Sequence, residues 1–119
     1  MNETPRFVYN LCRQPDWDAA LALGEYRGSA DDRRDGFVHF STAAQVQESA
    51  ARHRAGVADL LLLTVEAAAL GKALRWEASR GGQLFPHLYT ALPVASVARI
   101  DALGLGADGR HVFPPLNQD

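Results

Sequence analysis

The order of the predicted elements places this chain in the α+β class. Two helices are predicted in the first half, and the strands after them follow one another without intervening helices. Helices and strands that are segregated in this way are typical of α+β domains rather than of a regular βαβ array. With 119 residues, we expect one domain over residues 1–119. A chain of this size can bury a core without disulfides or metals.

A strand and a helix are predicted near the start of the chain. Residues 6–12 are rich in strand formers. Pro15 suits the first turn of a helix and Gly24 suits its end, and the apolar residues between them recur at helical spacing. The polar residues 27–35 are expected to form a loop.

A second strand and a second helix follow. Residues 36–41 predict the strand, and residues 42–55 predict the helix. Thr42 and Gln45 have the spacing of a capping box at the helix start, and Gly56 suits its end.

The second half of the chain predicts a succession of strands. Residues 59–66 are almost continuously apolar, which predicts a central strand buried on both faces. Pro86 suits an edge strand or a strand start, because it lacks an N–H group. A loop tail is expected over residues 104–119. Further strands are predicted over residues 73–78, 84–89 and 94–103.

Composition and charge exclude several classes of protein. The chain has 12 basic and 14 acidic residues, and this net charge of −2 argues against a nucleic acid partner. The single cysteine, Cys12, excludes an intramolecular disulfide and a zinc site built on cysteine pairs. The chain start has no apolar signal core, and the apolar run 60–63 is far shorter than the ~20 residues that span a bilayer. We therefore expect a cytoplasmic protein with no membrane partner.

His39, Ser41 and Thr42 are the first group of candidate site residues. On a strand, His39 and Ser41 share one face, and Thr42 precedes the predicted helix. Such a group can bind sugar hydroxyls or phosphate oxygens, helped by the free N–H groups of the helix start. The alternative is structural: a half-buried core histidine and an N-cap from Ser41 or Thr42.

Two further groups lie on later strands. Arg75 and Glu77 share one strand face, as do His87 and Tyr89. Glu77 can accept a hydrogen bond from a ligand hydroxyl while Arg75 or Arg80 supplies charge. The alternatives are an ion pair of little energetic worth on the surface and a structural histidine in a turn that lines the core.

Other motifs with chemical roles are weaker. His53 and His111 are weaker candidates, and the four scattered histidines predict no metal site. The H-x-[ST] motif repeated twice, which is typical of the two-histidine phosphoesterases, occurs only at His39. At His87 a tyrosine takes the place of the hydroxyl residue.

Four stretches, in order, resemble one bacterial family, the domain of unknown function 952. They are DGFVHFSTAAQV (35–46), LLLLTVEAAALG (60–71), LRWEASRGG (74–82) and LFPHLY (84–89). The resemblance covers about residues 6–101. The family is similar in fold to the ADP-ribosyltransferases, so the resemblance implies an ADP-ribosyltransferase-like split sheet around a cleft for NAD, with two early helices.

Two residues depart from the family pattern. Asn10 stands where family members often carry His or Lys, and Thr90 stands where they usually carry Gly. In ADP-ribosyltransferases the first strand supplies an Arg or His that holds the cofactor. Asn10 can hydrogen-bond to a cofactor but does not supply that charge.

We therefore expect a cleft that binds or transforms a nucleotide- or ADP-ribose-like ligand, with NAD as a candidate cofactor and no metal. The expected catalytic residues are Glu77, His39 and His87. The expected ligand-binding residues are Ser41, Thr42, Tyr89, Arg75 and Asn10. Glu77 would accept a hydrogen bond from a ribose hydroxyl and Tyr89 would stack on a flat ring. One alternative is a non-catalytic ligand-binding or sensor module, and another is an enzyme similar to the RNA 2′-phosphotransferases, which the net charge argues against.

Overall fold

Strand β4 (Leu60–Glu66) is the middle strand of a three-stranded antiparallel sheet. It pairs with β1 (Phe7–Arg13) on one side and with β8 (Val97–Leu103) on the other. The computed structural model describes residues 5–116, and it has the mixed α+β character that the sequence predicts. The four consecutive leucines of β4 are at most 6 % exposed, so the prediction of a buried central strand is confirmed.

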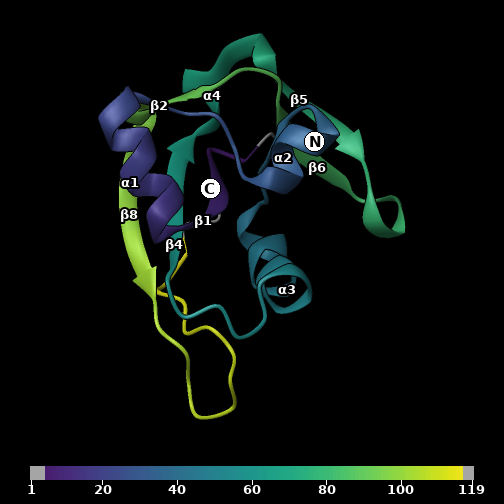
Figure 1. Ribbon diagram of the computed structural model, residues 1–119. Coiled ribbons are helices and arrows are strands. Elements are labelled where there is room, and N and C mark those ends of the chain that lie inside the picture. Colours follow the sequence, from purple (N-terminus) through teal and green to yellow (C-terminus); the bar gives the residue numbers. More distant parts are fainter. Residues whose placement is uncertain (1–4, 117–119) are drawn as a thin grey trace.

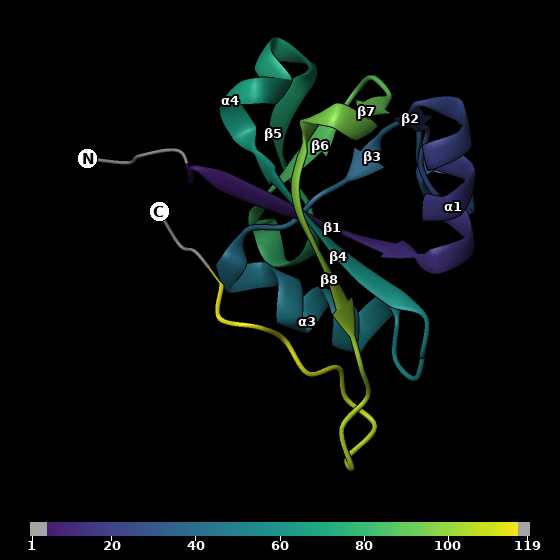
Figure 2. The ribbon, with the colours of Figure 1, turned by 90° about the vertical axis from the view of Figure 1, so that its left-hand side faces the viewer.

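The two faces of this sheet belong to two separate hydrophobic clusters. Leu61 packs with Trp17 of helix α1 (Gln14–Leu23) in one cluster, and Leu62 packs with Val46 of helix α3 (Ala43–His53) in the other. Neighbouring side chains on a strand point to opposite faces, so each face of β4 is covered by a different helix. Figure 2 shows α1 and α3 in separate places around the crossing strands.

Two smaller antiparallel sheets complete the fold (Figure 1). The second three-stranded sheet has the strand order β3-β6-β5, and a two-stranded sheet joins β2 to β7. The strands are β2 (Glu25–Tyr26), β3 (Val38–His39), β5 (Leu74–Ala78), β6 (Leu84–Leu88) and β7 (Leu92–Pro93). The remaining helical segments are α2 (Ala30–Asp35), α4 (Ala67–Leu70), η1 (Gly71–Ala73), η2 (Arg80–Gly82) and η3 (Val94–Ser96).

The two three-stranded sheets meet where β1 runs beside the residues that follow β3. Tyr9 and Ser41 exchange two backbone hydrogen bonds, each of 2.8 Å. Next to this bridge, Nδ2 of Asn10 donates to the carbonyl oxygen of His39 at 2.7 Å. Polar side chains from β1, β3 and β6 therefore lie close together at the junction.

Helix α2 corrects the prediction of a loop over residues 27–35. Ser29 Oγ accepts from the N–H of Asp32 at 3.1 Å, and Asp32 Oδ2 accepts from the N–H of Ser29 at 2.9 Å. This reciprocal pair is a capping box, and Gly36 ends the helix with φ 89°. The helix has no apolar periodicity because Asp32 is its only residue classed as buried, so the sequence pattern hid it.

Helix α3 begins as predicted. Gln45 Oε1 accepts from the N–H of Thr42 at 3.0 Å, which satisfies the backbone donor of the N-cap residue. The strand predicted over residues 36–41 is shorter, because only Val38–His39 joins the ladder with β6.

Strand β6 corrects the expectation for Pro86. It is the middle strand of its sheet rather than an edge strand. The ladder between β3 and β6 ends at the pair of His39 and His87, and the Pro86 carbonyl then accepts from the N–H of Phe40 at 3.0 Å. The proline lies just beyond the end of β3, where its missing N–H interrupts few ladder bonds.

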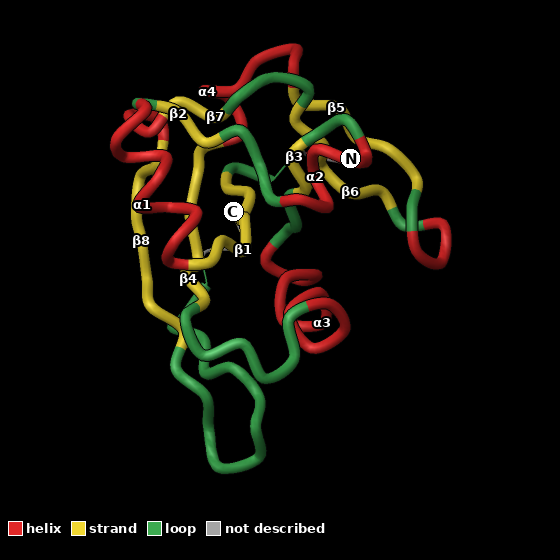
Figure 3. The backbone as a smooth tube through the Cα atoms, in the orientation of Figure 1, coloured by secondary structure: helices red, strands yellow, loops and turns green. Residues whose placement is uncertain are grey.

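The described residues after β8 form a loop that turns back along the molecule (Figure 3). A single bridge joins Leu105 to His111, and Nε2 of His111 lies 2.7 Å from the carbonyl oxygen of Val57. Phe113 and Leu116 pack against the cluster that contains Val46. Among residues 5–116, none of the helices is both long and apolar enough to cross a bilayer.

Candidate functional site

A cavity of about 180 Å³ lies at the junction of the two three-stranded sheets. Its wall includes residues of β1, α2, α3 and β6, so distant parts of the chain contribute to it. Of the residues predicted from the sequence, Asn10, His39, Ser41 and His87 line it. The other predicted residues, Thr42, Arg75, Glu77 and Tyr89, are absent from its lining.

His39 is held between two carboxylates of α2. Nδ1 lies 2.5 Å from Oδ1 of Asp32, and Nε2 lies 3.1 Å from Oδ2 of Asp35. Both ring nitrogens can donate at once only when the ring carries two protons and a positive charge. Asp32 is 4 % exposed, whereas Asp35 lies at the surface, where a hydrogen bond from Arg34 and the neighbouring His39 lower its pKa.

His87 forms a second pair with a carboxylate. Its Nδ1 lies 2.7 Å from Oε1 of Glu77, and the hydroxyl of Tyr89 donates to the same oxygen at 2.7 Å. The hydrogen bonds from Tyr89 and His87 lower the pKa of Glu77, and the Glu77 carboxylate raises the pKa of Tyr89. Since an ionised carboxylate only accepts, Nδ1 of His87 carries the proton of this bond.

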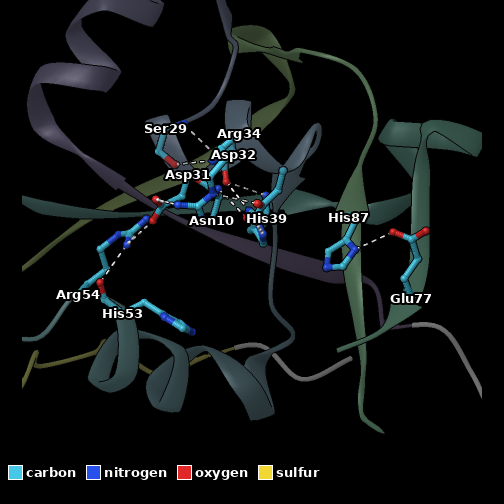
Figure 4. A network of polar contacts seen from close by, with 11 residues as sticks. Asn10, Ser29, Asp31, Asp32, Arg34, His39, His53, Arg54, Glu77 and His87 are labelled. Atoms are coloured by element: carbon cyan, nitrogen blue, oxygen red, sulfur yellow. Dashed lines mark hydrogen bonds and ion pairs between the residues drawn. The ribbon is translucent and has the colours of Figure 1, made fainter. Parts of the chain in front are cut away.

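Nε2, the second ring nitrogen of His87, is available to a ligand. His87 is 6 % exposed, and no hydrogen bond to Nε2 is found within residues 5–116. When Nδ1 donates to Glu77, a neutral ring has a lone pair at Nε2 that can accept a proton or a hydrogen bond. Figure 4 shows His87 between Glu77 and the group around His39.

Phe37 joins the two histidine–carboxylate pairs. Its ring stacks on His87 at 4.0 Å between centroids and lies tilted against His39 at 4.5 Å. The two histidine rings are 5.6 Å apart, edge to face. A flat apolar ring on both imidazoles limits their rotation, so Phe37 helps to hold their relative orientation.

Polar groups of β1 and α3 form another part of the wall. The hydroxyls of Ser41 and Ser49 lie 3.1 Å apart, and both residues are buried. Asn10 is 3 % exposed, and in the described part of the chain its Oδ1 has no hydrogen-bond partner. Its Nδ2 donates to the His39 carbonyl, so Oδ1 is assigned as the acceptor.

Arg54 supplies positive charge at the end of α3. It is half-buried, its Nη1 donates to the carbonyl oxygen of His53 at 2.9 Å, and its nearest carboxylate, Asp31, is 3.8 Å away. His53 lies one helical turn after Ser49, and both line the cavity with Arg54. This face of the wall therefore carries the Arg54 guanidinium and the His53 imidazole next to hydroxyl groups.

A family model now gives this site a context. The model described as "Protein of unknown function (DUF952)" matches residues 11–100. The chain belongs to this family. A crystal structure of protein CC0527 from Caulobacter crescentus is 50% identical over 89% of this chain and 93% of that chain, with a TM-score of 0.87. A solution NMR structure of CC0527 is 51% identical over 87% of this chain and 90% of that chain, with a TM-score of 0.79. A comparison with curated proteins finds no match.

Within this DUF952 domain, the predicted residues outside the cavity have identifiable contacts. Thr42 is the N-cap of α3, and its backbone N–H is held by Gln45. The guanidinium of Arg75 lies over the ring of Tyr89, 4.6 Å from its centroid. Glu77 and Tyr89 lie on the far side of His87 from the cavity, which they meet through that histidine.

The sequence pattern did not single out Asp32 and Arg54, which line the DUF952 cavity, or Phe37, which packs against its two histidines. Asp32 lies in the segment that was expected to be a polar loop, and Arg54 lies near the end of the helix predicted over residues 42–55. The spacing of Ser29 and Asp32 is a capping-box signal that would have located the helix carrying Asp32. No local signal places Phe37 against His87, because that contact joins the residue before β3 to the distant strand β6.

The thiol of Cys12 is buried in this domain. Burial raises the pKa of the Cys12 thiol to about 12, so the thiolate that acts as a nucleophile is scarce. Among the described residues, no group of three or more His, Cys, Asp or Glu side chains is arranged to hold a metal ion.

Proposed function

We propose that this cavity binds a small ligand with both hydroxyl and phosphate groups, of the nucleotide or ADP-ribose type. The observation that carries the proposal is Oδ1 of Asn10, a buried acceptor without a partner in the described chain, in the wall of a polar cavity. An unpaired buried acceptor costs roughly 1–3 kcal/mol, and a ligand hydroxyl that donates to it removes this cost.

The other groups of the wall fit the same ligand class. Nε2 of His87 is a second acceptor for a ribose hydroxyl, and the hydroxyls of Ser41 and Ser49 can bind sugar or phosphate oxygens. Arg54 and His53 lie beside them, and an Arg guanidinium matches the geometry of a phosphate. The cavity is smaller than the roughly 300–1,000 Å³ of sites that enclose drug-sized ligands, so it fits the sugar phosphate of a nucleotide and leaves the base outside.

The family resemblance supports the same ligand class. The division into two three-stranded sheets with a cavity at their junction agrees with an ADP-ribosyltransferase-like cleft. If NAD binds here, Asn10 and Ser41 would hold a ribose, and Arg54 would hold the pyrophosphate. NAD would supply a ribose linked to a good leaving group.

The charge around the cavity weighs against a polynucleotide. Asp31, Asp32 and Asp35 of α2 line the cavity, and the whole chain has a net charge of −2. Binding of a nucleic acid depends on the neutralisation of many phosphates by Lys and Arg. A single nucleotide needs far fewer such contacts, so we favour it over the RNA ligand of a 2′-phosphotransferase-like enzyme.

A binding titration tests the proposal. ADP-ribose, NAD and AMP are added to the full chain, and the melting temperature and the amide NMR spectrum are followed. A ligand at a hundred times its Kd stabilises the fold by about 2.7 kcal/mol, which a melting curve resolves. Arg54→Gln should weaken binding roughly 10- to 150-fold, because a charge-assisted hydrogen bond contributes ~1.5–3 kcal/mol.

Arg99→Gln is the matched control, because Arg99 pairs with Asp101 on β8 and is absent from the cavity lining. It should bind like the parent chain. The proposal fails if none of the three ligands shifts the melting curve or the amide signals of residues in the cavity wall.

A further inference from the structure

The two histidines of the cavity wall are prepared for opposite proton transfers. Glu77 fixes the proton of His87 on Nδ1 and leaves Nε2 as an acceptor. Asp32 and Asp35 face both nitrogens of His39, and this arrangement is satisfied by a ring that carries both protons. The rings are 5.6 Å apart and line the same cavity, so one ligand can contact both.

We propose that His87 and His39 are a general base and a general acid that hydrolyse a ribose 2′,3′-cyclic phosphate bound in this cavity. The inference rests on the proposed function, because it needs a ribose phosphate at this site. It adds an activity, a substrate class and a role for each histidine.

The step consumes one water molecule. Nε2 of His87 takes a proton from water as the water oxygen forms a bond to phosphorus. The bond from phosphorus to one ribose oxygen breaks, and that oxygen takes the proton from Nε2 of His39. The product is a ribose phosphomonoester, and a proton passes from His87 to His39 through solvent to restore the starting state. General acid–base catalysis of this kind contributes ~10²- to 10⁴-fold in rate.

The need for both a base and an acid selects the bond that is broken. A ribose oxygen leaves as an alkoxide and needs a proton, whereas a pyridine-type base that leaves the ribose of NAD departs as a neutral molecule. That second reaction needs no general acid, so His39 would have no role in it. A phosphate ester with an alkoxide leaving group uses both histidines.

The charge of the site suits a cyclic diester. Asp31, Asp32 and Asp35 line the cavity together with Arg34 and Arg54, and Arg34 pairs with Asp31 and Asp35. A cyclic diester carries one negative charge, whereas a phosphomonoester carries about −1.5 to −2 charges at pH 7. Arg54 can balance the single charge of the diester, and the monoester product carries more charge than Arg54 balances.

Asp35 explains how the proton on Nε2 of His39 becomes available. Its carboxylate lies at the surface and also accepts from Nε of Arg34 at 3.2 Å, so it has a second partner. Asp32, in contrast, is buried and also accepts from the N–H of Ser29. Its hydrogen bond with Nδ1 of His39 therefore stays in place. A ligand oxygen that replaces Asp35 at Nε2 receives the proton there.

Glu77 acts in this scheme as a positioning residue. It is absent from the cavity lining, and it fixes the ring of His87 and the position of its proton. Glu77→Gln should therefore lower kcat by about tenfold or more and leave the affinity for the product nearly unchanged. A purely structural role would instead lower the affinity for the product together with kcat.

The test uses adenosine 2′,3′-cyclic phosphate and the full chain. Ring opening is followed by ³¹P NMR, and the reaction is repeated in ¹⁸O-labelled water. The parent chain should open the ring and place the label on phosphorus. His87→Gln and His39→Gln should each reduce turnover by at least about a hundredfold. His39 is partly exposed, so its variant keeps the test decisive if His87→Gln does not fold.

His111→Gln is the matched control, because this histidine contacts Val57 in the loop after β8, and it should retain full turnover. A second substrate, a short RNA that ends in a cyclic phosphate, separates the two sources of this group, and the mononucleotide should react faster. Binding of AMP without any ring opening by the parent chain overturns the acid–base pair and leaves the proposed ligand class intact. Absence of binding by AMP, ADP-ribose and NAD overturns both.

Discussion

Nδ1 of His87 lies 2.7 Å from Oε1 of Glu77, although ten residues separate them along the chain. The register of the β5–β6 pair produces this contact. His87 is directly opposite Arg75, and Glu77 is directly opposite Phe85, so the two residues are diagonal neighbours on one face. A shift of the register by one residue would move His87 to the other face and remove it from both Glu77 and the cavity.

The first prediction concerns the pH dependence of stability at Glu77. Hydrogen bonds from Tyr89 and His87 lower the pKa of Glu77 below its ordinary 4.5 in the folded chain. A lowered folded-state pKa stabilises the fold above the unfolded pKa, and this contribution is lost as the pH falls through the folded value. The parent chain should thus melt above Glu77→Gln at neutral pH, and the gap should close as the pH falls below 4.5.

Melting curves of both chains across this pH range check the prediction. Glu48→Gln is a suitable control, because Glu48 lies on an exposed position of α3. A gap between the parent chain and Glu77→Gln that stays constant down to the acid limit would contradict it.

The second prediction concerns the core at Leu62. This side chain is fully buried between β1 and β8 and packs against α3. Leu62→Ala should lower the free energy of unfolding by about 2–5 kcal/mol, because it removes apolar contacts and leaves a cavity. Ile100→Ala on β8 should change it by less than about 1 kcal/mol, because Ile100 is 45 % exposed. Urea titrations measure both, and similar losses for the two variants would show that β4 is not the central strand.

The third prediction concerns the helix that carries Asp32. Ser29→Ala removes the N-cap of α2 and should cost about 0.5–2 kcal/mol. It should also move Asp32 and change the ¹⁵N chemical shifts of the His39 ring, because Asp32 holds both Ser29 and His39. Ser29→Thr keeps the hydroxyl and should preserve both stability and shifts. A Ser29→Ala chain with parental His39 shifts would show that the cap does not position the histidine.

The fourth prediction concerns Cys12. Burial raises the pKa of its thiol to about 12, so almost no thiolate is present near neutral pH. The folded chain should react with an aromatic disulfide reagent far more slowly than the chain in denaturant, and the absorbance of the released thiol measures both rates. Equal rates would show that Cys12 is accessible in the native state.

Local patterns in the sequence predicted much of the fold. The apolar run that forms β4, the capping box at Thr42 and the glycine at the end of α1 each act over a few residues, so each can be recognised without knowledge of the rest of the chain. The polar alternation of β3, β5 and β6 likewise singled out His39, Glu77 and His87, because a strand places every second side chain on one face.

Tertiary structure alone decided how these residues work together. The strand order put Pro86 in a middle strand, and the β1–β3 junction put Asn10 beside the backbone of His39. The pairing of β3 with β6 put Phe37, the residue before β3, against His87. The sequence by itself thus determined which residues could carry chemistry, because residue type and strand period are local properties. Which residues share a cavity, and which nitrogen of each histidine is occupied, depends on contacts between residues far apart in the chain, and local pattern carries no information about those distances.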